Sequence, residues 1–257
     1  MSNPEQRFHA SSAFQPEHIA QKMTVETQPD HSLETWLTHI HDTVLRAYPS
    51  LEGVRPDVLF SDPHAHAESI SGMHLPPTNE EPHEILVQMG SEKHLQHARQ
   101  ERPIAFAVAA ELLGILPEEL NAEVFNSFVF LHEFGHAHDY VTNFQQVPEL
   151  SHLTPDELAL VWQNEHVQEK EALPIPSLAP AEILEQLQTM TWEQFLDAHP
   201  HIRTRLAEQN LHTQEEALAA QDRAYRSMPS EHYADKFAAA FIREHLSASL
   251  NDSEKSA

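Results

Sequence analysis

An apolar segment with helical periodicity, residues 118–140, restricts the folds open to this chain more than any other part of its sequence. One face of the expected helix carries a stripe that ends in two histidines: Phe125, Val129, His132 and His136. A stripe of this kind faces a core, so both histidines are expected to point inward. Glycine inside a helix costs about 1 kcal/mol relative to alanine. Because the chain has only 5 glycines, Gly135 within this helix indicates that another element passes close to it.

Helical spacing predicts further helices along the chain at 33–48, 92–113, 155–172, 181–189, 191–197, 214–226 and 230–247. Pro103 is expected to kink or split the second of these. Residues 58–60 and 84–89 are expected strands, and the stretch 61–83, rich in Pro, Ser and His, is expected to be a loop. The expected fold is α+β and predominantly α-helical, with a small β-sheet before the helix at 118–140 and a helical C-terminal part.

A single domain is expected over residues 31–247. Its first part, 31–140, holds the sheet and the histidine-bearing helix, and its second part, 141–247, is helical. Residues 1–30 are polar and contain three prolines, which predicts a mobile arm. Residues 248–257 are expected to form a polar tail.

The composition excludes several classes of function. The chain has 15 Lys and Arg against 40 Asp and Glu, and this acidic balance disfavours binding to nucleic acid and to anionic membranes. The absence of cysteine excludes disulfides and thiolate ligands, so any metal must be held by His, Asp or Glu. The N-terminus does not read as a classical signal peptide and no stretch is apolar enough to span a bilayer. The expected location is the cytoplasm, with export by another route left open.

The segment 132–136 reads His-Glu-Phe-Gly-His, the HExxH spacing. Positions i and i+4 of a helix share a face, so His132 and His136 can both reach one ion at about 2.0–2.1 Å. Glu133 sits beside them, where a carboxylate can act on a water molecule without binding the metal. We therefore expect one Zn²⁺ per chain, with Glu133 as a general base.

Three places offer a third ligand: His138, the group Glu165, His166 and Glu169, and Glu231. His138 lies roughly 200° around a continuous helix from His136, on the wrong face. The group at 165–169 lies in a polar segment that is typical of a solvated helix face. Glu231 is favoured, because it shares one helix face with Asp235 and with small residues that permit close packing. Asp235 is expected to accept a hydrogen bond from the free ring nitrogen of one histidine ligand.

HExxH with a downstream ExxxD helix resembles the gluzincins, a large group of zinc peptidases. The stretch 231–238, Glu-x-x-Ala-Asp-x-Phe-Ala, also looks like the third-ligand helix of the ImmA/IrrE-like peptidases. The resemblance covers roughly residues 84–140 and 222–246. It implies a zincin-like fold with Glu133 as general base, Glu231 as third ligand and Asp235 as the partner of a ligand. The 94 residues 137–230 that separate the two motifs are more than is typical of the compact ImmA/IrrE-like peptidases.

The expected function is zinc-dependent hydrolysis of peptide bonds in a peptide or protein substrate, with a zinc-activated water. Four side chains are candidates for stabilising the oxyanion: Tyr233, His232, Tyr225 and Tyr140. By analogy with gluzincins, the strand at 84–89 is expected to be an edge strand that pairs with an extended substrate. One alternative is a zinc-binding regulatory or interaction protein without proteolytic turnover, and another is a metal-free helical interaction protein.

Overall fold

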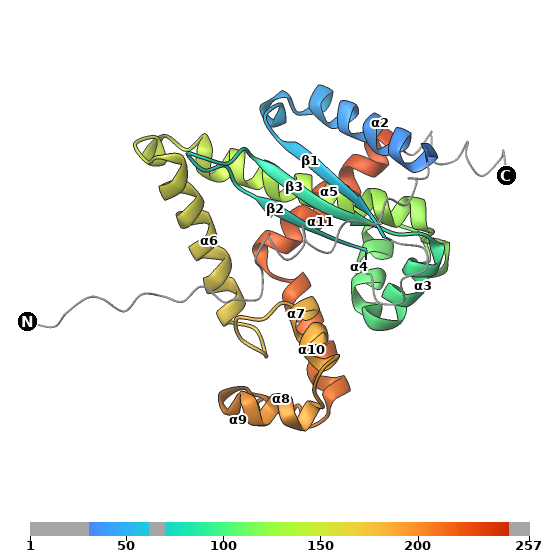
Figure 1. The fold of residues 1–257 in the computed structure, drawn as a ribbon, viewed down its shortest axis with the longest axis vertical. Helices are drawn as coiled ribbons and strands as arrows, with labels where there is room; N and C mark the ends of the chain where they lie inside the picture. The colour runs from blue at the N-terminus through green and yellow to red at the C-terminus, as the bar shows by residue number, and fades with distance from the viewer. Residues whose placement is uncertain (1–30, 62–69, 247–257) are drawn as a thin grey trace, which may run out of the picture.

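The computed structural model describes residues 31–61 and 70–246, so the expected arm at 1–30 and tail at 248–257 lie outside the described residues. The described part has an α+β fold that is predominantly α-helical, as the sequence predicts (Figure 1). Its first half contains α2 (His31–Ala47), β1 (Arg55–Phe60), β2 (Ser71–Leu75), β3 (Glu84–Met89), α3 (Glu92–Glu101), α4 (Pro103–Leu113) and α5 (Ala122–Tyr140). Its second half contains α6 (Pro155–Glu171), α7 (Pro180–Leu187), α8 (Trp192–Ala198), α9 (Pro200–Glu208), α10 (Gln214–Arg226) and α11 (Pro229–Phe241). Short 3₁₀ or π-helical turns lie between or after these helices: η1 (Pro49–Leu51), η2 (Pro117–Glu119), η3 (Val141–Gln145), η4 (Pro148–Leu150) and η5 (Ile242–Leu246).

The three strands form one sheet in the order β1-β3-β2. β3 pairs with β1 in parallel and with β2 in antiparallel orientation, and Val87 faces both Val58 and Gly72 in the register. The expectation that 84–89 is an edge strand is therefore wrong, because β1 and β2 occupy both of its sides. β2 is the edge strand nearest to α5, and it lies in the stretch 61–83 that was expected to be a loop.

The helix boundaries follow local chemistry. Pro103 splits the expected helix at 92–113 into α3 and α4, as predicted, and Gly114 ends α4 in the left-handed region at φ 75°. α5 begins at Ala122 and not at 118, because residues 117–119 form a separate 3₁₀ turn. The Asn121 side chain then caps α5 by accepting a hydrogen bond from the backbone N–H of Val124 at 2.9 Å.

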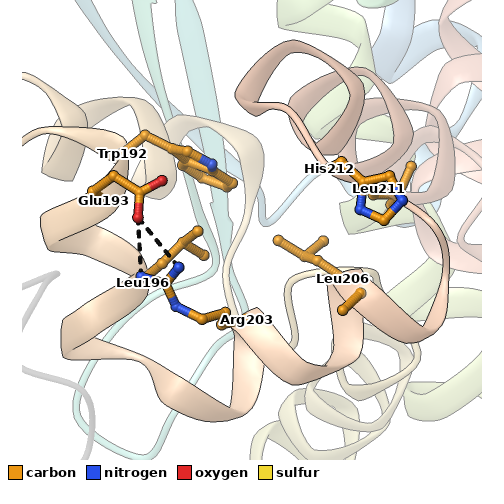
Figure 2. A pocket seen from close by; sticks show the side chains of 8 residues that line it. Trp192, Glu193, Leu196, Arg203, Leu206, Leu211 and His212 are labelled. Atoms are coloured by element: carbon orange, nitrogen blue, oxygen red, sulfur yellow. Dashed lines mark hydrogen bonds and ion pairs between the residues drawn. The ribbon is translucent and has the colours of Figure 1, made fainter.

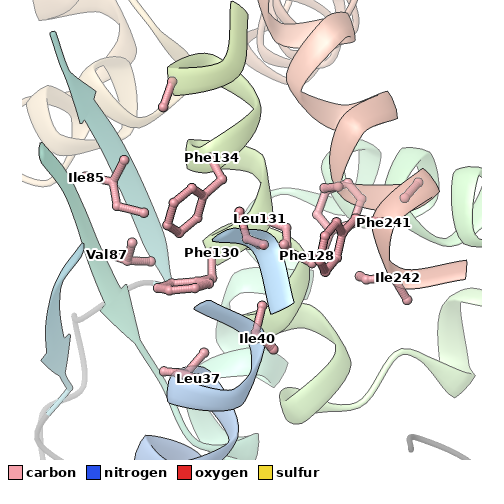
Figure 3. Close-up of a cluster of buried hydrophobic side chains, with 14 of the residues drawn as sticks. Leu37, Ile40, Ile85, Val87, Phe128, Phe130, Leu131, Phe134, Phe241 and Ile242 are labelled. Atoms are coloured by element: carbon pink, nitrogen blue, oxygen red, sulfur yellow. The ribbon is translucent and has the colours of Figure 1, made fainter. Parts of the chain in front are cut away.

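α5 is the centre of the main core. Figure 3 shows Phe130 and Phe134 of α5 beside Ile85 and Val87 of β3, and Phe128 beside α11. Side chains around almost the whole circumference of α5 are buried, which is the pattern of a helix enclosed by other elements. The polar side chains that α5 carries at its middle are therefore removed from solvent together with the aromatic ones.

A second cluster of buried apolar side chains lies in α7–α10 and the segment just before α7, at the end of the molecule opposite α2 (Figure 1). Its buried members are Ile175, Ile183, Phe195, Leu196, Ile202, Leu206 and Ala217. α9 was not expected from the sequence, and it completes this cluster by burying Ile202 and Leu206. Much of the long segment between the two motifs thus folds around apolar contacts of its own.

Among the described residues, the helices are too short or too polar to cross a lipid bilayer.

Candidate metal centre

α5 and α11 approach each other closely at Gly135. A Cβ atom added at Gly135 would lie 2.7 Å from the Cα and 3.1 Å from the Cβ of Ala234. Glycine on one helix and alanine on the other therefore let the two backbones come together, which confirms the expectation that another element passes close to Gly135. The contact places the first turns of α11 beside the HExxH segment.

This packing brings His132, His136 and Glu231 together. The two Nε2 atoms lie 3.1 Å apart, and the Glu231 carboxylate oxygens lie 3.4 Å from His132 Nε2 and 3.6 Å from His136 Nε2. One ligand atom from each residue lies within 4.8 Å of the others, and all three side chains are buried. The 94-residue separation in sequence is closed by the α5–α11 contact.

Asp235 fixes the orientation of His132. Its Oδ1 accepts a hydrogen bond from His132 Nδ1 at 2.8 Å, so Nε2 of that ring faces His136 and Glu231. A carboxylate on the free nitrogen of a histidine ligand holds the ring and its tautomer in place. The sequence predicts that Asp235 binds one of the two histidines without indicating which, and in the structure it is His132.

The charges in the centre are strongly coupled. Burial disfavours the charged ring of His132, but Asp235 and Glu231 outweigh burial and raise its pKa to about 10. Burial and the neighbouring positive charge lower the pKa of His136 to about 3. Burial acts to raise the pKa of Glu231, yet the two histidines and Arg226 outweigh it and hold that pKa below its usual range. Without a metal ion, the His132 ring is therefore protonated and positively charged at neutral pH.

Glu133 lies against the backbone of the edge strand. A Cβ atom added at Gly72 of β2 would lie only 2.5 Å from both Cγ and Oε1 of Glu133. Burial, with a further contribution from Glu231, raises the pKa of Glu133 to about 7. Glu133 is 5% exposed whereas Gly72 is exposed, so solvent reaches the strand directly beside this carboxylate. This contact could not be predicted from the sequence, because Gly72 lies in a stretch expected to be a loop.

The donor set fits zinc. Two imidazole nitrogens and one carboxylate oxygen are the ligands found in catalytic zinc sites, which keep a fourth position for water or substrate. Calcium and magnesium prefer oxygen ligands alone. Within the described residues, the buried Nδ1 of His136 also has no hydrogen-bond partner, which leaves this ring less constrained than His132.

The four candidate oxyanion donors lie in different surroundings. Tyr233 donates a hydrogen bond to His138 Nδ1 at 2.7 Å, and His232 is exposed, so neither is brought to the ligands. Burial and the adjacent Glu231 carboxylate raise the pKa of Tyr225 well above its usual value. Of the three residues Tyr225, Tyr233 and His232, Tyr225 is thus the one beside Glu231, the candidate third ligand.

The three α6 residues that were the alternative source of a third ligand point to different surroundings. Glu165 is exposed, and Glu169 accepts a hydrogen bond from the Ser230 hydroxyl. His166 donates from Nδ1 to the Trp162 carbonyl at 3.0 Å, and its ring centroid lies 6.0 Å from that of His136. α6 therefore flanks the centre, while the group whose ligand atoms converge is His132, His136 and Glu231.

Two further histidines near the centre were missed. His74 on β2 and His83 before β3 are buried, with their Nε2 atoms 2.7 Å apart, and the His74 ring lies 6.4 Å from that of His136. Burial lowers the pKa of His83 to about 4 and that of His74 well below its usual value, so both rings are neutral at pH 7. Tyr140 packs against this pair, and burial raises its pKa to about 12. Scattered histidines in a supposed loop gave no signal for such a pair.

A surface pocket of about 140 Å³ lies in the second cluster, beside α8 and α9 (Figure 2). Apolar side chains such as Trp192 and Leu206 line it, and Arg203 pairs with Glu193 at 3.2 Å on one side. All of its lining residues lie between positions 192 and 212, so this pocket is separate from the metal centre.

Comparison of the chain with protein-family models, with curated proteins and with solved structures gives no match. Any functional assignment therefore depends on the geometry of the metal centre itself.

Proposed function

We propose that this chain is a zinc-dependent peptidase in which His132, His136 and Glu231 hold the metal and Glu133 is the general base. The observation that carries the proposal is the convergence of His132, His136 and Glu231 from two helices that lie far apart in sequence, with the buried Glu133 next to His132 in the chain. A structural zinc site normally has four protein ligands, whereas a three-residue set with a neighbouring carboxylate suits catalysis. The resemblance to gluzincins agrees with this assignment, and membership of that group stays a prediction.

Each residue has a distinct task in the proposed reaction. Zinc, when bound, supplies a Lewis acid that polarises the scissile carbonyl and acidifies water. Glu133 would take the proton of the attacking water and pass it to the leaving amine. Tyr225 stays protonated at neutral pH because its pKa is raised, so it can donate a hydrogen bond to the oxyanion. The exposed edge of β2, in place of 84–89, is the strand on which an extended substrate would pair.

The test uses two variants of the full chain. Glu133→Gln should abolish peptide hydrolysis and keep the zinc content of the wild type, because Glu133 is not a ligand. Glu231→Ala should lower the zinc content as well as the activity. Glu165→Gln is the matched control, since Glu165 is an exposed acid on α6 and should keep both properties. Full hydrolysis in Glu133→Gln would refute the mechanism.

The alternative is a zinc-binding regulatory or interaction protein without turnover. The low exposure of His132, Glu133, His136 and Glu231, from 5% to 7%, favours this reading, because a substrate must reach these groups before it is cleaved. A peptide library incubated with zinc-loaded protein separates the two functions. Cleavage that depends on Glu133 supports the peptidase, and full zinc loading without any cleavage supports the alternative. The cytoplasmic location and the nature of the substrate stay predictions.

A further inference from the structure

Arg226, the last residue of α10, reaches into the metal centre from outside the two motifs. Its Nη1 lies 3.2 Å from Asp235 Oδ1 and 3.7 Å from Glu231 Oε2. The Arg226 side chain is 15% exposed, and those of Glu231 and Asp235 are 7% and 1% exposed. A guanidinium thus contacts both the third ligand and the carboxylate that orients His132.

Arg226 contacts the same Asp235 oxygen that accepts the hydrogen bond from His132. Asp235 Oδ1 accepts hydrogen bonds from His132 Nδ1 at 2.8 Å and from Arg226 Nη1 at 3.2 Å, whereas Oδ2 has no partner within the described residues. The guanidinium and the imidazole thus share a single carboxylate oxygen. Loss of the guanidinium leaves His132 Nδ1 as the one partner that holds this carboxylate within the described residues.

The charge balance of the centre also depends on Arg226. Glu133, Glu231 and Asp235 place three carboxylates in a buried region. When all three carboxylates are ionised and both histidines are neutral, the charges of the carboxylates, of Arg226 and of a divalent cation sum to zero. Buried charges are tolerated when they are paired, so removing Arg226 leaves an uncompensated negative charge beside the metal.

Arg226 belongs to the 94-residue segment between the two motifs, residues 137–230. Ala217 of α10 is buried in the second cluster, and the Gln221 side chain accepts from the backbone N–H of Ile175 at 2.7 Å and donates to its carbonyl at 3.1 Å. One helix therefore begins in the second cluster and ends at the metal centre. Beside it, Asp222 of the same helix pairs with Arg102 at 3.6 Å.

We propose that Arg226 is a positioning residue of the metal centre, which holds Asp235 and Glu231 in the geometry that binds the metal. This proposal rests on the proposed function, since it assumes that His132 and Glu231 are ligands. It also assigns a role to the long segment between the motifs, which is to place a cation behind the two carboxylates.

The test measures zinc affinity of the purified full chain by competition with a chelator, together with the absorption spectrum of the cobalt-loaded protein. Arg226→Met is expected to weaken zinc binding about 10–100-fold, the range found when partners of metal ligands are removed. Arg226→Lys keeps the charge and should recover part of the affinity. Arg223→Met, an exposed arginine one turn earlier on α10, is the control and should bind as the wild type does.

Two further readouts separate positioning from folding. The cobalt spectrum of Arg226→Met should change, because the ligand geometry changes, whereas a purely structural role would lower stability and leave the spectrum of the folded fraction intact. If Arg226→Met does not fold, Arg226→Lys decides, and an affinity equal to that of the wild type overturns the proposal. A wild-type chain that takes up no zinc would overturn both proposals, while wild-type affinity and spectrum in Arg226→Met would overturn this one alone.

Discussion

Substitution of Gly135 by alanine probes the contact that brings the proposed metal ligands together. The added Cβ would lie 2.7 Å from Ala234 Cα, whereas ordinary contact begins at 3.4 Å, so the helices must separate locally by about 0.7 Å. Metal–ligand distances tolerate deviations of only about 0.2 Å. Because Glu231 is carried by the displaced helix, we expect zinc affinity to fall by about 10-fold or more, as it does when the support of a ligand is lost.

The same substitution has two opposed effects on stability. Alanine gains about 1 kcal/mol in helix propensity over glycine. Overpacking of a tight contact costs about 1–3 kcal/mol. We therefore expect a net loss of about 0–2 kcal/mol in the free energy of unfolding, measured by urea denaturation of the metal-free chain, with a clearly larger effect on zinc affinity.

Gly53→Ala is the matched control, because an added Cβ there meets nothing within 4 Å. It should leave both zinc affinity and hydrolysis unchanged. If Gly135→Ala binds zinc as tightly as the wild type and gains the full propensity of alanine, then α5 and α11 do not meet as described, and the reasoning is refuted.

Three other outcomes are expected. Gly72→Ala should keep zinc but lose most hydrolysis, because its Cβ would displace the Glu133 carboxylate from a distance of 2.5 Å, and unchanged turnover would contradict the placement of β2. Zinc binding at pH 7 should release at least one proton, because His132 has a pKa of about 10 without metal and must be neutral as a ligand, and Glu133, with a pKa of about 7, adds to the release when a cation favours its ionised form. Affinity should then rise with pH through the neutral range, and a proton release clearly below one, measured by calorimetry in buffers of different ionisation enthalpy, would contradict His132 as a ligand. Phe130→Ala, at a core side chain only 1% exposed, should lower the free energy of unfolding by about 3–5 kcal/mol. Leu116→Ala, at a side chain 56% exposed, should change it by less than about 0.5 kcal/mol, and equal effects of the two variants would contradict the described core.

The parts of the centre that follow a helix period could be predicted from the sequence. His132 and His136 continue an apolar stripe on their helix. Glu231 and Asp235 lie one turn apart on a helix face with small residues. Both patterns therefore predict which face of each helix is buried. Gly135 indicated a close approach for the same reason, since an unfavourable residue inside a helix needs a packing explanation.

The parts that depend on contacts distant in sequence could not be predicted. β2 contains glycine and lacks β-branched side chains, so its strand conformation comes from pairing with β3 and not from local preference. Arg226 at the end of a helix is equally suited to the helix dipole, and its sequence does not reveal the two carboxylates that it meets. His74 became part of the centre's surroundings only when β2 packed against α5.

The most direct measurement is zinc X-ray absorption of the purified, zinc-loaded chain. The proposed centre predicts one tightly bound zinc per chain, with a coordination shell at about 2.0–2.1 Å that contains two imidazoles and oxygen ligands. The imidazole signal should be halved in a His136→Ala variant. A chain that retains no zinc after dialysis, or a shell without two imidazoles, would contradict the central claim.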